Sequence, residues 1–148
     1  MENIWIGCGF AGWGVAQFCK LVSSFIQTRK IDFSYFVSTG GMPSAHSATV
    51  ASIAMSIGLT NGFDSPLFGL AFAVAGITMF DASSLRMHAG RQARLLNEIT
   101  RQIFKERSWP QKPLKELLGH TRFEVFMGML VGMAVGACLT SLWCCIRG

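Results

Sequence analysis

Residues able to do chemistry are rare in the apolar parts of this sequence, and they occur where apolar runs begin or end. They are Lys20, Ser44, His46, Asp81, Arg86, Lys115, His120 and Glu124. The set combines two imidazoles, three cations and a hydroxyl, whereas its two carboxylates are far apart in the sequence. Fixed cations and imidazoles can bind an anion and neutralise the charge that develops during phosphoryl transfer. We therefore expect an anion site capable of phosphoryl transfer without a metal ion or other cofactor.

Two of these features have a spacing that suggests specific roles. His120 and Glu124 are four residues apart, which places them on one face of a helix. A carboxylate there can hold the imidazole in one tautomer, leaving the other ring nitrogen to act as a nucleophile. Ser44 and His46 open an apolar run, and the free N–H groups of a helix start attract anions. Each residue alone could be a helix cap or a snorkelling side chain, but together they favour a functional site.

The elements that must position these residues are strongly apolar. The sequence is 51% hydrophobic and 14% charged, against about 25% charged in an average soluble domain. Four apolar segments, 4–25, 44–59, 65–80 and 123–146, contain only Lys20 and Glu124 as charged residues. A membrane-spanning helix needs about 20 apolar residues. We expect an all-α, polytopic membrane bundle of about four spans in a single domain, 1–148; the alternative is a soluble bundle of buried helices.

The polar stretch between the third and fourth segments contains one further predicted helix. Within 84–107, small or apolar residues recur at three- and four-residue spacing, and arginines and lysines lie between them. This pattern is typical of a basic amphipathic helix on a membrane surface. It predicts the lipid bilayer and anionic lipids as partners, and no nucleic acid.

The basic residues also predict the orientation. With four spans, only Arg147 of the 13 lysines and arginines falls on the side of the termini, and the remaining twelve lie on or near the other side. The positive-inside rule makes that other side cytoplasmic and places both termini outside. All the candidate site residues fall on the cytoplasmic side. The first segment is expected to be retained, because it lacks the basic start and cleavage site of a signal peptide.

Two other patterns are better explained by packing than by chemistry. The run GCGFAG, 7–12, matches the dinucleotide-binding fingerprint, but no strand precedes it and it lies in an apolar segment. Its glycines, like Gly128, Gly132 and Gly136, suit close helix contacts. The five cysteines lie in apolar segments without zinc-ligand spacing, and we interpret them as packing thiols.

Several motifs resemble those of a known superfamily. The run MPSAHSA, 42–48, resembles the Pro-Ser-Gly-His motif of the type 2 phosphatidic acid phosphatases and vanadium haloperoxidases. The run GHTRFEVFMG, 119–128, resembles their last motif, His-x-x-x-Asp-Val-x-x-Gly, with Glu124 in place of the aspartate. More closely, GGMPSAHSA, FDASSLRMHAGRQARLLN and LKELLGH occur in the order found in a small divergent branch of that superfamily.

This resemblance implies roles for individual residues. His120 would form a phosphohistidine, Glu124 would orient it, and His46 would protonate the leaving oxygen. The residues expected to bind substrate are Lys20, Ser44, Arg86, Lys115 and Asp81, with Arg86 standing in for the last-motif arginine. The implied function is hydrolysis of a phosphomonoester such as phosphatidylglycerophosphate, phosphatidate or a polyprenyl phosphate. A non-catalytic lipid- or phosphate-binding protein, a small transporter, and a homo-oligomer whose second subunit completes the site stay open.

Overall fold

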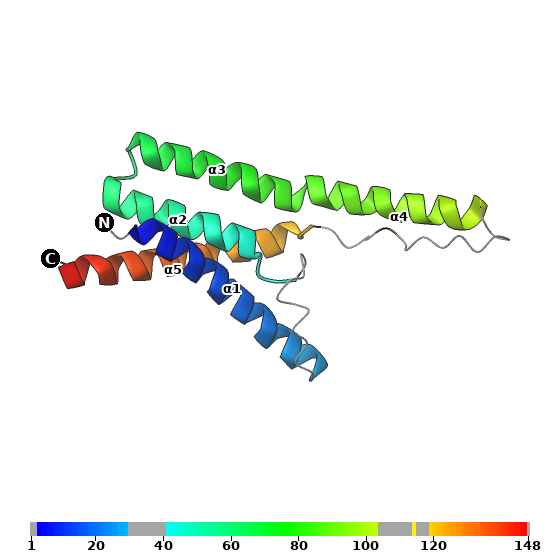
Figure 1. Ribbon diagram of the computed structural model, residues 1–148, viewed down its shortest axis with the longest axis horizontal. Helices are drawn as coiled ribbons and strands as arrows, with labels where there is room; N and C mark the ends of the chain where they lie inside the picture. The colour runs from blue at the N-terminus through cyan, green and yellow to red at the C-terminus, as the bar shows by residue number, and fades with distance from the viewer. Residues whose placement is uncertain (1–2, 30–40, 104–113, 115–118, 148) are drawn as a thin grey trace.

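The computed structural model of the chain describes residues 3–29, 41–103, 114 and 119–147, and it contains five helices (Figure 1). They are α1 Ile4–Thr28, α2 Ala45–Asn61, α3 Pro66–Ser83, α4 Leu85–Ile103 and α5 Arg122–Arg147. The described residues include no strand. The predicted all-α fold is therefore confirmed, and α1, α2, α3 and α5 correspond to the four apolar segments.

Capping residues explain where three of the helices begin. Asn3 caps α1 by accepting a hydrogen bond from the Trp5 amide at 3.2 Å. Ser44 caps α2, and Ser65 caps α3, where Pro66 takes the first helical position. Asparagine and serine satisfy amides that no helical carbonyl can reach, and proline lacks the amide altogether. The polar residue before each of these three apolar segments therefore sets where its helix begins.

The centre of the bundle is a close, parallel contact between α2 and α5. A Cβ atom added to Gly128, Gly132 or Gly136 of α5 would collide with a backbone carbonyl oxygen of α2, that of Ser44, Ala48 or Ser52 respectively. Both helices thus use small residues at four-residue spacing along the whole contact. In lipid, helices associate through such packing and through polar contacts rather than through the hydrophobic effect.

Buried hydroxyl and thiol groups join α1 to this pair. Ser52 donates from Oγ to the carbonyl of Cys8 at 2.7 Å, and Thr140 donates from Oγ1 to Oγ of Ser56 at 2.8 Å. The Cys8 thiol lies 3.7 Å from Oγ1 of Thr140 and is completely buried. Cys8 is therefore a packing thiol, as the sequence suggested, whereas the predicted packing role does not hold for the exposed Cys138, Cys144 and Cys145. At the start of α1, Nε1 of Trp5 donates to Oγ1 of Thr60, near the end of α2, at 2.9 Å, so α1 runs antiparallel to α2.

Helix directions bring three helix ends together beside the C-terminal half of α1. The start of α1, the turn between α2 and α3, and the end of α5 lie at one end of the bundle (Figure 1). The C-terminal half of α1, the start of α2, the end of α3 and the start of α5 therefore face the opposite end. We call this opposite end the polar end, because it contains Lys20, His46, His120 and Glu124.

Two helical stretches have the length and composition needed to cross a bilayer, namely Pro66–Ile103 and Arg122–Arg147. Within the described residues, α1 and α2 do not meet that criterion. However, α2 packs along α5 from Ser44 to Ser56 and contacts α1 and α3 as well. If α5 crosses the membrane, α2 must lie at the same depth. This argument supports four spans, a number that stays a prediction.

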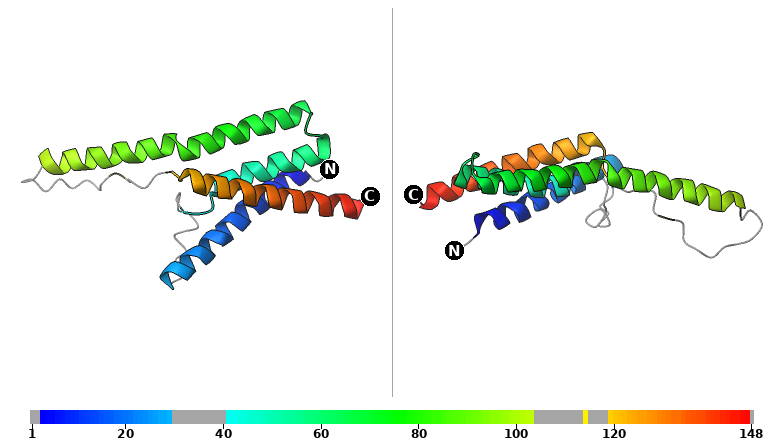
Figure 2. Two further views of the ribbon diagram at one scale, coloured as in Figure 1. Left: turned by 180° about the vertical axis from the view of Figure 1, so that it is seen from behind. Right: turned by 90° about the horizontal axis from the view of Figure 1, so that it is seen from above.

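The amphipathic helix predicted after the third segment is α4, but its direction was not foreseen. It follows α3 after a single break at Ser84 and continues in nearly the same direction (Figures 1 and 2). Its apolar residues Leu95, Leu96 and Ile103 are exposed, as are its arginines at 91, 94 and 101. A location on the membrane surface would require a bend near Ser84, and that location stays a prediction.

Cysteine accessibility gives a direct test of this topology. In a variant without the native cysteines, Asp64→Cys in the α2–α3 turn and Gln102→Cys on α4 should react with an impermeant thiol reagent from opposite sides of sealed vesicles. Both positions are exposed, so burial cannot mask labelling. We expect only Gln102→Cys to be labelled from the cytoplasmic side, because the basic residues gather there. Labelling of both positions from one side would contradict the predicted topology.

Candidate functional site

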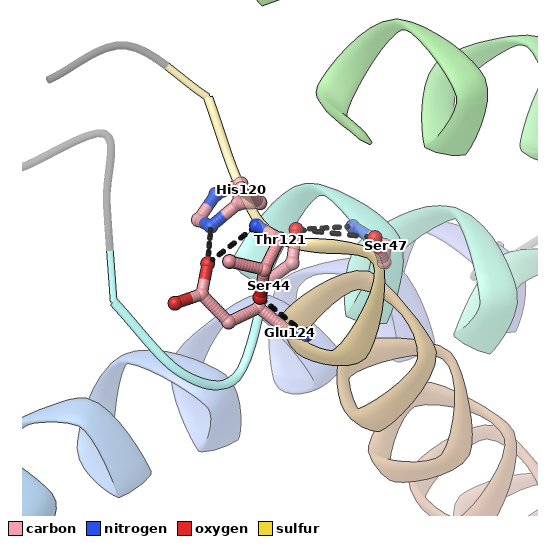
Figure 3. A network of polar contacts seen from close by, with 5 residues as sticks. All are labelled: Ser44, Ser47, His120, Thr121 and Glu124. Atoms are coloured by element: carbon pink, nitrogen blue, oxygen red, sulfur yellow. Dashed lines mark hydrogen bonds and ion pairs between the residues drawn. The ribbon is translucent and has the colours of Figure 1, made fainter. Parts of the chain in front are cut away.

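His120 and Glu124 form the centre of the candidate site, and their predicted contact is present, but they do not share a helix face as expected, because His120 precedes the start of α5. Nδ1 of His120 lies 3.1 Å from Oε2 of Glu124 (Figure 3). The same carboxylate oxygen accepts the amide of Thr121 at 3.0 Å, and Oγ1 of Thr121 accepts the amide of Glu124 at 3.2 Å. This reciprocal arrangement is a capping box at the start of α5. It fixes the carboxylate, which in turn orients the imidazole and leaves Nε2 outside this contact.

The backbone around His120 is anchored to α3. The His120 amide donates to the carbonyl of Ala82 at 2.9 Å, which satisfies one of the carbonyls that a helix end leaves open. Gly119 adopts φ +93° immediately before it, a conformation that favours glycine. The His120 side chain is 2% exposed. The nucleophile candidate is therefore held by α3, by α5 and by a tight turn.

Ser44 has a structural role that the sequence did not reveal. Its amide donates to the backbone carbonyl of Glu124 at 3.0 Å, which ties the start of α2 to the start of α5. Its Oγ accepts hydrogen bonds from the Ser47 amide at 3.4 Å and the Ser47 hydroxyl at 3.1 Å (Figure 3). The residue is completely buried. Phosphate binding by Ser44 stays a prediction.

His46 lies in the first turn of α2 and faces the same centre. Its ring centroid is 6.4 Å from that of His120, with the two planes at 61°. Unlike His120, His46 is exposed. Two imidazoles at this separation can contact a common anion. His46 can also exchange protons with solvent, as a general acid must.

Lys20 supplies a buried cation from α1. It is 5% exposed and close enough to His120 and Glu124 to interact electrostatically with both. A buried ammonium needs such compensation, because removing it from water costs several kcal/mol. Gln17 and Ser24, on the same face of α1, are also buried. The sequence analysis identified Lys20 but not these two neighbours, although they follow the same helical spacing.

The surroundings of His120 set its protonation. Burial lowers the pKa of His120 below its usual range, and the charges of Lys20 and His46 act in the same direction. The hydrogen bond and charge of Glu124 oppose this shift, but only in part. The imidazole is therefore neutral at neutral pH, which is the form that can act as a nucleophile.

A pH profile tests this assignment. The rate of phosphate release by the wild-type protein should persist as the pH falls through 6.5, because the pKa of His120 is lowered. The rate should decline only at lower pH. Glu124→Gln removes the group that raises this pKa, so the acid limb should move to still lower pH. On the pH-independent plateau, the rate of the Glu124→Gln protein should be about 10²-fold below that of the wild type, within the usual range for a proton-transfer or orienting group.

The same shift makes a prediction for stability. The unfolded chain binds a proton on His120 more readily than the folded chain, so the free energy of unfolding should decrease as the pH falls below 6.5.

Glu98→Gln, at an exposed carboxylate on α4 that pairs with Arg101, is the matched control for Glu124→Gln in the pH–rate profile. An unchanged acid limb in Glu124→Gln, or the same shift in both variants, would contradict the assignment.

For three other predicted site residues, the structure gives less information about their part in the site. Asp81 lies in the last turn of α3, next to the Ala82 carbonyl that binds His120, and its side chain is partly exposed. Arg86 lies in the first turn of α4, and its side chain is outside the described part of the structure. Lys115 lies outside the described residues. Substrate binding by these three residues stays a prediction.

Fold and site together define a helical membrane protein with a histidine–carboxylate pair at the polar end of the bundle. The chain belongs to the Divergent PAP2 family, whose model matches residues 1–135. It is 44% identical over 129 residues to the uncharacterized membrane protein YuiD of Bacillus subtilis (strain 168), covering 80% of this chain and 82% of that protein. No solved structure matches the chain.

Proposed function

We propose that this protein is a membrane lipid phosphate phosphatase that acts through a phosphohistidine. The observation that carries this proposal is the contact of the buried His120 with the partly exposed Glu124, 3.1 Å apart, with His46 and Lys20 around them. A histidine held in one tautomer by a carboxylate, beside a second histidine and a fixed cation, has the groups that metal-free phosphoryl transfer needs. Family membership supports the class of reaction.

The proposed reaction has two steps. In the first, Nε2 of His120 attacks phosphorus, the bond from phosphorus to the ester oxygen breaks, and His46 gives its proton to that oxygen as the alcohol leaves. In the second, His46 takes a proton from water, the water oxygen attacks phosphorus, and the bond to Nε2 breaks. The products are the lipid alcohol and inorganic phosphate, and His46 is protonated again for the next turnover.

The neighbouring groups would lower the barrier to both steps. Glu124 would stabilise the cationic imidazole of the phosphohistidine, because it already contacts Nδ1. Lys20 and the positive end of the α2 dipole would stabilise the charge that develops on the phosphoryl oxygens. Arg86 and Lys115 are proposed to add further positive charge from the α3–α4 junction and the segment before α5.

The substrate is proposed to be a lipid because the site lies at the end of apolar helices. A phosphate group at the cytoplasmic interface could reach the polar end while its hydrocarbon stays in the membrane. Phosphatidylglycerophosphate, phosphatidate and polyprenyl phosphates all have this arrangement. A cytoplasmic site suits an intermediate of lipid biosynthesis, and both termini would then lie outside.

A substrate screen tests the function. The purified protein in lipid nanodiscs should release inorganic phosphate from at least one of these lipid phosphates in the presence of EDTA. The matching lipid alcohols, which lack phosphate, serve as blanks. Release that requires added divalent metal, or no release from any of the lipid phosphates, would contradict the proposal.

One observation favours a second candidate, a protein that binds lipid phosphate without turnover. His120 and Lys20 are almost completely buried, so a phosphoryl group must enter past the exposed His46 to reach them. Binding of vanadate or a lipid phosphate without release of phosphate would favour this candidate.

A further inference from the structure

One face of α1 changes from apolar to polar along its length. Ile6, Phe10 and Trp13 lie on this face, and Gln17 and Lys20 continue it toward the polar end. At 3.6 residues per turn, these five positions fall within a narrow stripe. The first three are at least 43% exposed, whereas Gln17 and Lys20 are buried. The stripe therefore has an apolar, lipid-accessible part and a polar, enclosed part.

A groove follows the apolar part of this stripe. It has a volume of about 370 Å³ and is lined by Ile6, Gly9, Phe10, Trp13, Thr49 and Ile53. Its floor is a close contact between the two helices at Gly9, where an added Cβ would lie only 2.8 Å from Cδ1 of Ile53. The groove therefore runs between α1 and α2 and is open toward the surrounding lipid.

The α2 side of the groove leads to the candidate site. Thr49 follows His46 by three residues, and Ile53 follows it by seven, so all three lie on one face of α2. A rise of 1.5 Å per residue places Ile53 about 10 Å from His46 along the helix. Both walls of the groove therefore become polar at the same end, with Lys20 on α1 and His46 on α2.

We infer that this groove holds a hydrocarbon chain of a lipid phosphate whose phosphate group lies at His46, Lys20 and His120. The identity of the headgroup rests on the proposed function, whereas the position of the chain rests on the groove. The apolar walls match a hydrocarbon, and the cations and imidazoles at one end match a phosphate. Lipid tails around the protein are as apolar as the groove, so the groove alone cannot favour one lipid over another. The phosphate group makes the site prefer a lipid phosphate, and the groove sets the direction of its hydrocarbon chain.

Photolabelling tests the location directly. A lipid phosphonate that resists hydrolysis, with a diazirine near the middle of its chain, is added to the wild-type protein in nanodiscs. Label should map to α1 and α2 residues of the groove and should be displaced by the unlabelled phosphonate but not by the corresponding lipid alcohol. Label spread evenly over the outward faces of α3 and α5, or equal displacement by the alcohol, would overturn the inference.

A steric block with a matched control tests the effect on the reaction. Thr49→Phe should fill the groove, whereas Thr78→Phe places the same residue on α3, away from it. Each threonine donates from Oγ1 to the carbonyl four residues earlier at 2.8 Å, so both substitutions remove the same local contact. We expect Thr49→Phe to raise KM for a long-chain lipid phosphate about tenfold and to leave hydrolysis of a short-chain phosphate ester unchanged.

The two experiments separate this inference from the proposed function. Groove labelling that depends on the phosphonate, in a protein that hydrolyses nothing, would support the groove and refute the phosphatase. Hydrolysis with equal KM values in Thr49→Phe and Thr78→Phe would support the phosphatase and refute the groove. A loss of short-chain hydrolysis in Thr49→Phe would also refute the inference, because the block would then act on the site itself.

Discussion

The His120→Ala variant is expected to lose phosphate release by about 10³-fold or more, which corresponds to at least 4 kcal/mol of transition-state stabilisation. The substitution removes the proposed nucleophile, the imidazole that Glu124 orients through Nδ1. The backbone bond from residue 120 to Ala82 and the capping box at Thr121 do not need the imidazole. The variant should therefore still fold. The measurement is steady-state phosphate release in nanodiscs.

His88→Ala is the matched control, since His88 is the exposed histidine of α4. It should retain wild-type activity within about twofold, as expected for an exposed surface position. Elution of both variants as the wild-type species in detergent would show that folding is intact. Near-normal release by a folded His120→Ala protein would exclude a phosphohistidine at this residue.

His46 should show a different signature, because a general acid matters only when the leaving group needs a proton. For an alkyl lipid phosphate, His46→Ala should lower the rate by about 10²–10⁴-fold. For a nitrophenyl ester, whose leaving group departs readily as an anion, the loss should be much smaller. An equal loss on both substrates would assign His46 a binding role instead.

Gly132→Ala is expected to cause the largest loss of stability. The new Cβ would collide with the Ala48 carbonyl oxygen on α2, and a backbone atom cannot move away as a side chain could. Separating α2 from α5 should cost about 1–3 kcal/mol or more, the usual cost of overpacking a tight contact. The measurement is the midpoint of unfolding in a mixed-micelle denaturant titration.

Gly76→Ala on α3 is the control, because no atom lies within 4 Å of a Cβ added there. On helix propensity alone, replacing glycine with alanine stabilises a helix by about 1 kcal/mol. The two substitutions should therefore shift the unfolding midpoint in opposite directions. A stabilised Gly132→Ala protein would contradict the close α2–α5 contact.

Much of the site was predictable because its reactive residues lie at informative positions, either four residues apart or at the ends of apolar segments. The four-residue spacing of His120 and Glu124 predicted their contact, although the contact forms across the start of α5 and not on one helix face. The convergence of Lys20, His46 and His120 followed from alternating the directions of successive apolar segments. The start of α2 at Ser44 was predictable for the same physical reason, since a polar cap must precede a helix that is apolar throughout.

Other features depend on contacts that spacing does not encode. One is the hydrogen bond from the Ser44 amide to the Glu124 carbonyl, which ties α2 to α5 at a completely buried residue. The direction of α4 depends on the geometry at Ser84, which composition does not specify. The capping box formed by Thr121 and Glu124 follows the T-x-x-E pattern of the sequence, a signal that the sequence analysis did not use.

The most direct test of the account is to trap and locate the covalent intermediate. The wild-type protein, mixed rapidly with a lipid phosphate carrying labelled phosphorus and quenched in alkali, should retain label on one peptide containing His120. Phosphohistidine survives alkali and is lost in acid, so acid treatment should release the label, and the His120→Ala protein should never acquire it. Label on another residue, or turnover with no labelled protein at any quench time, would contradict the account.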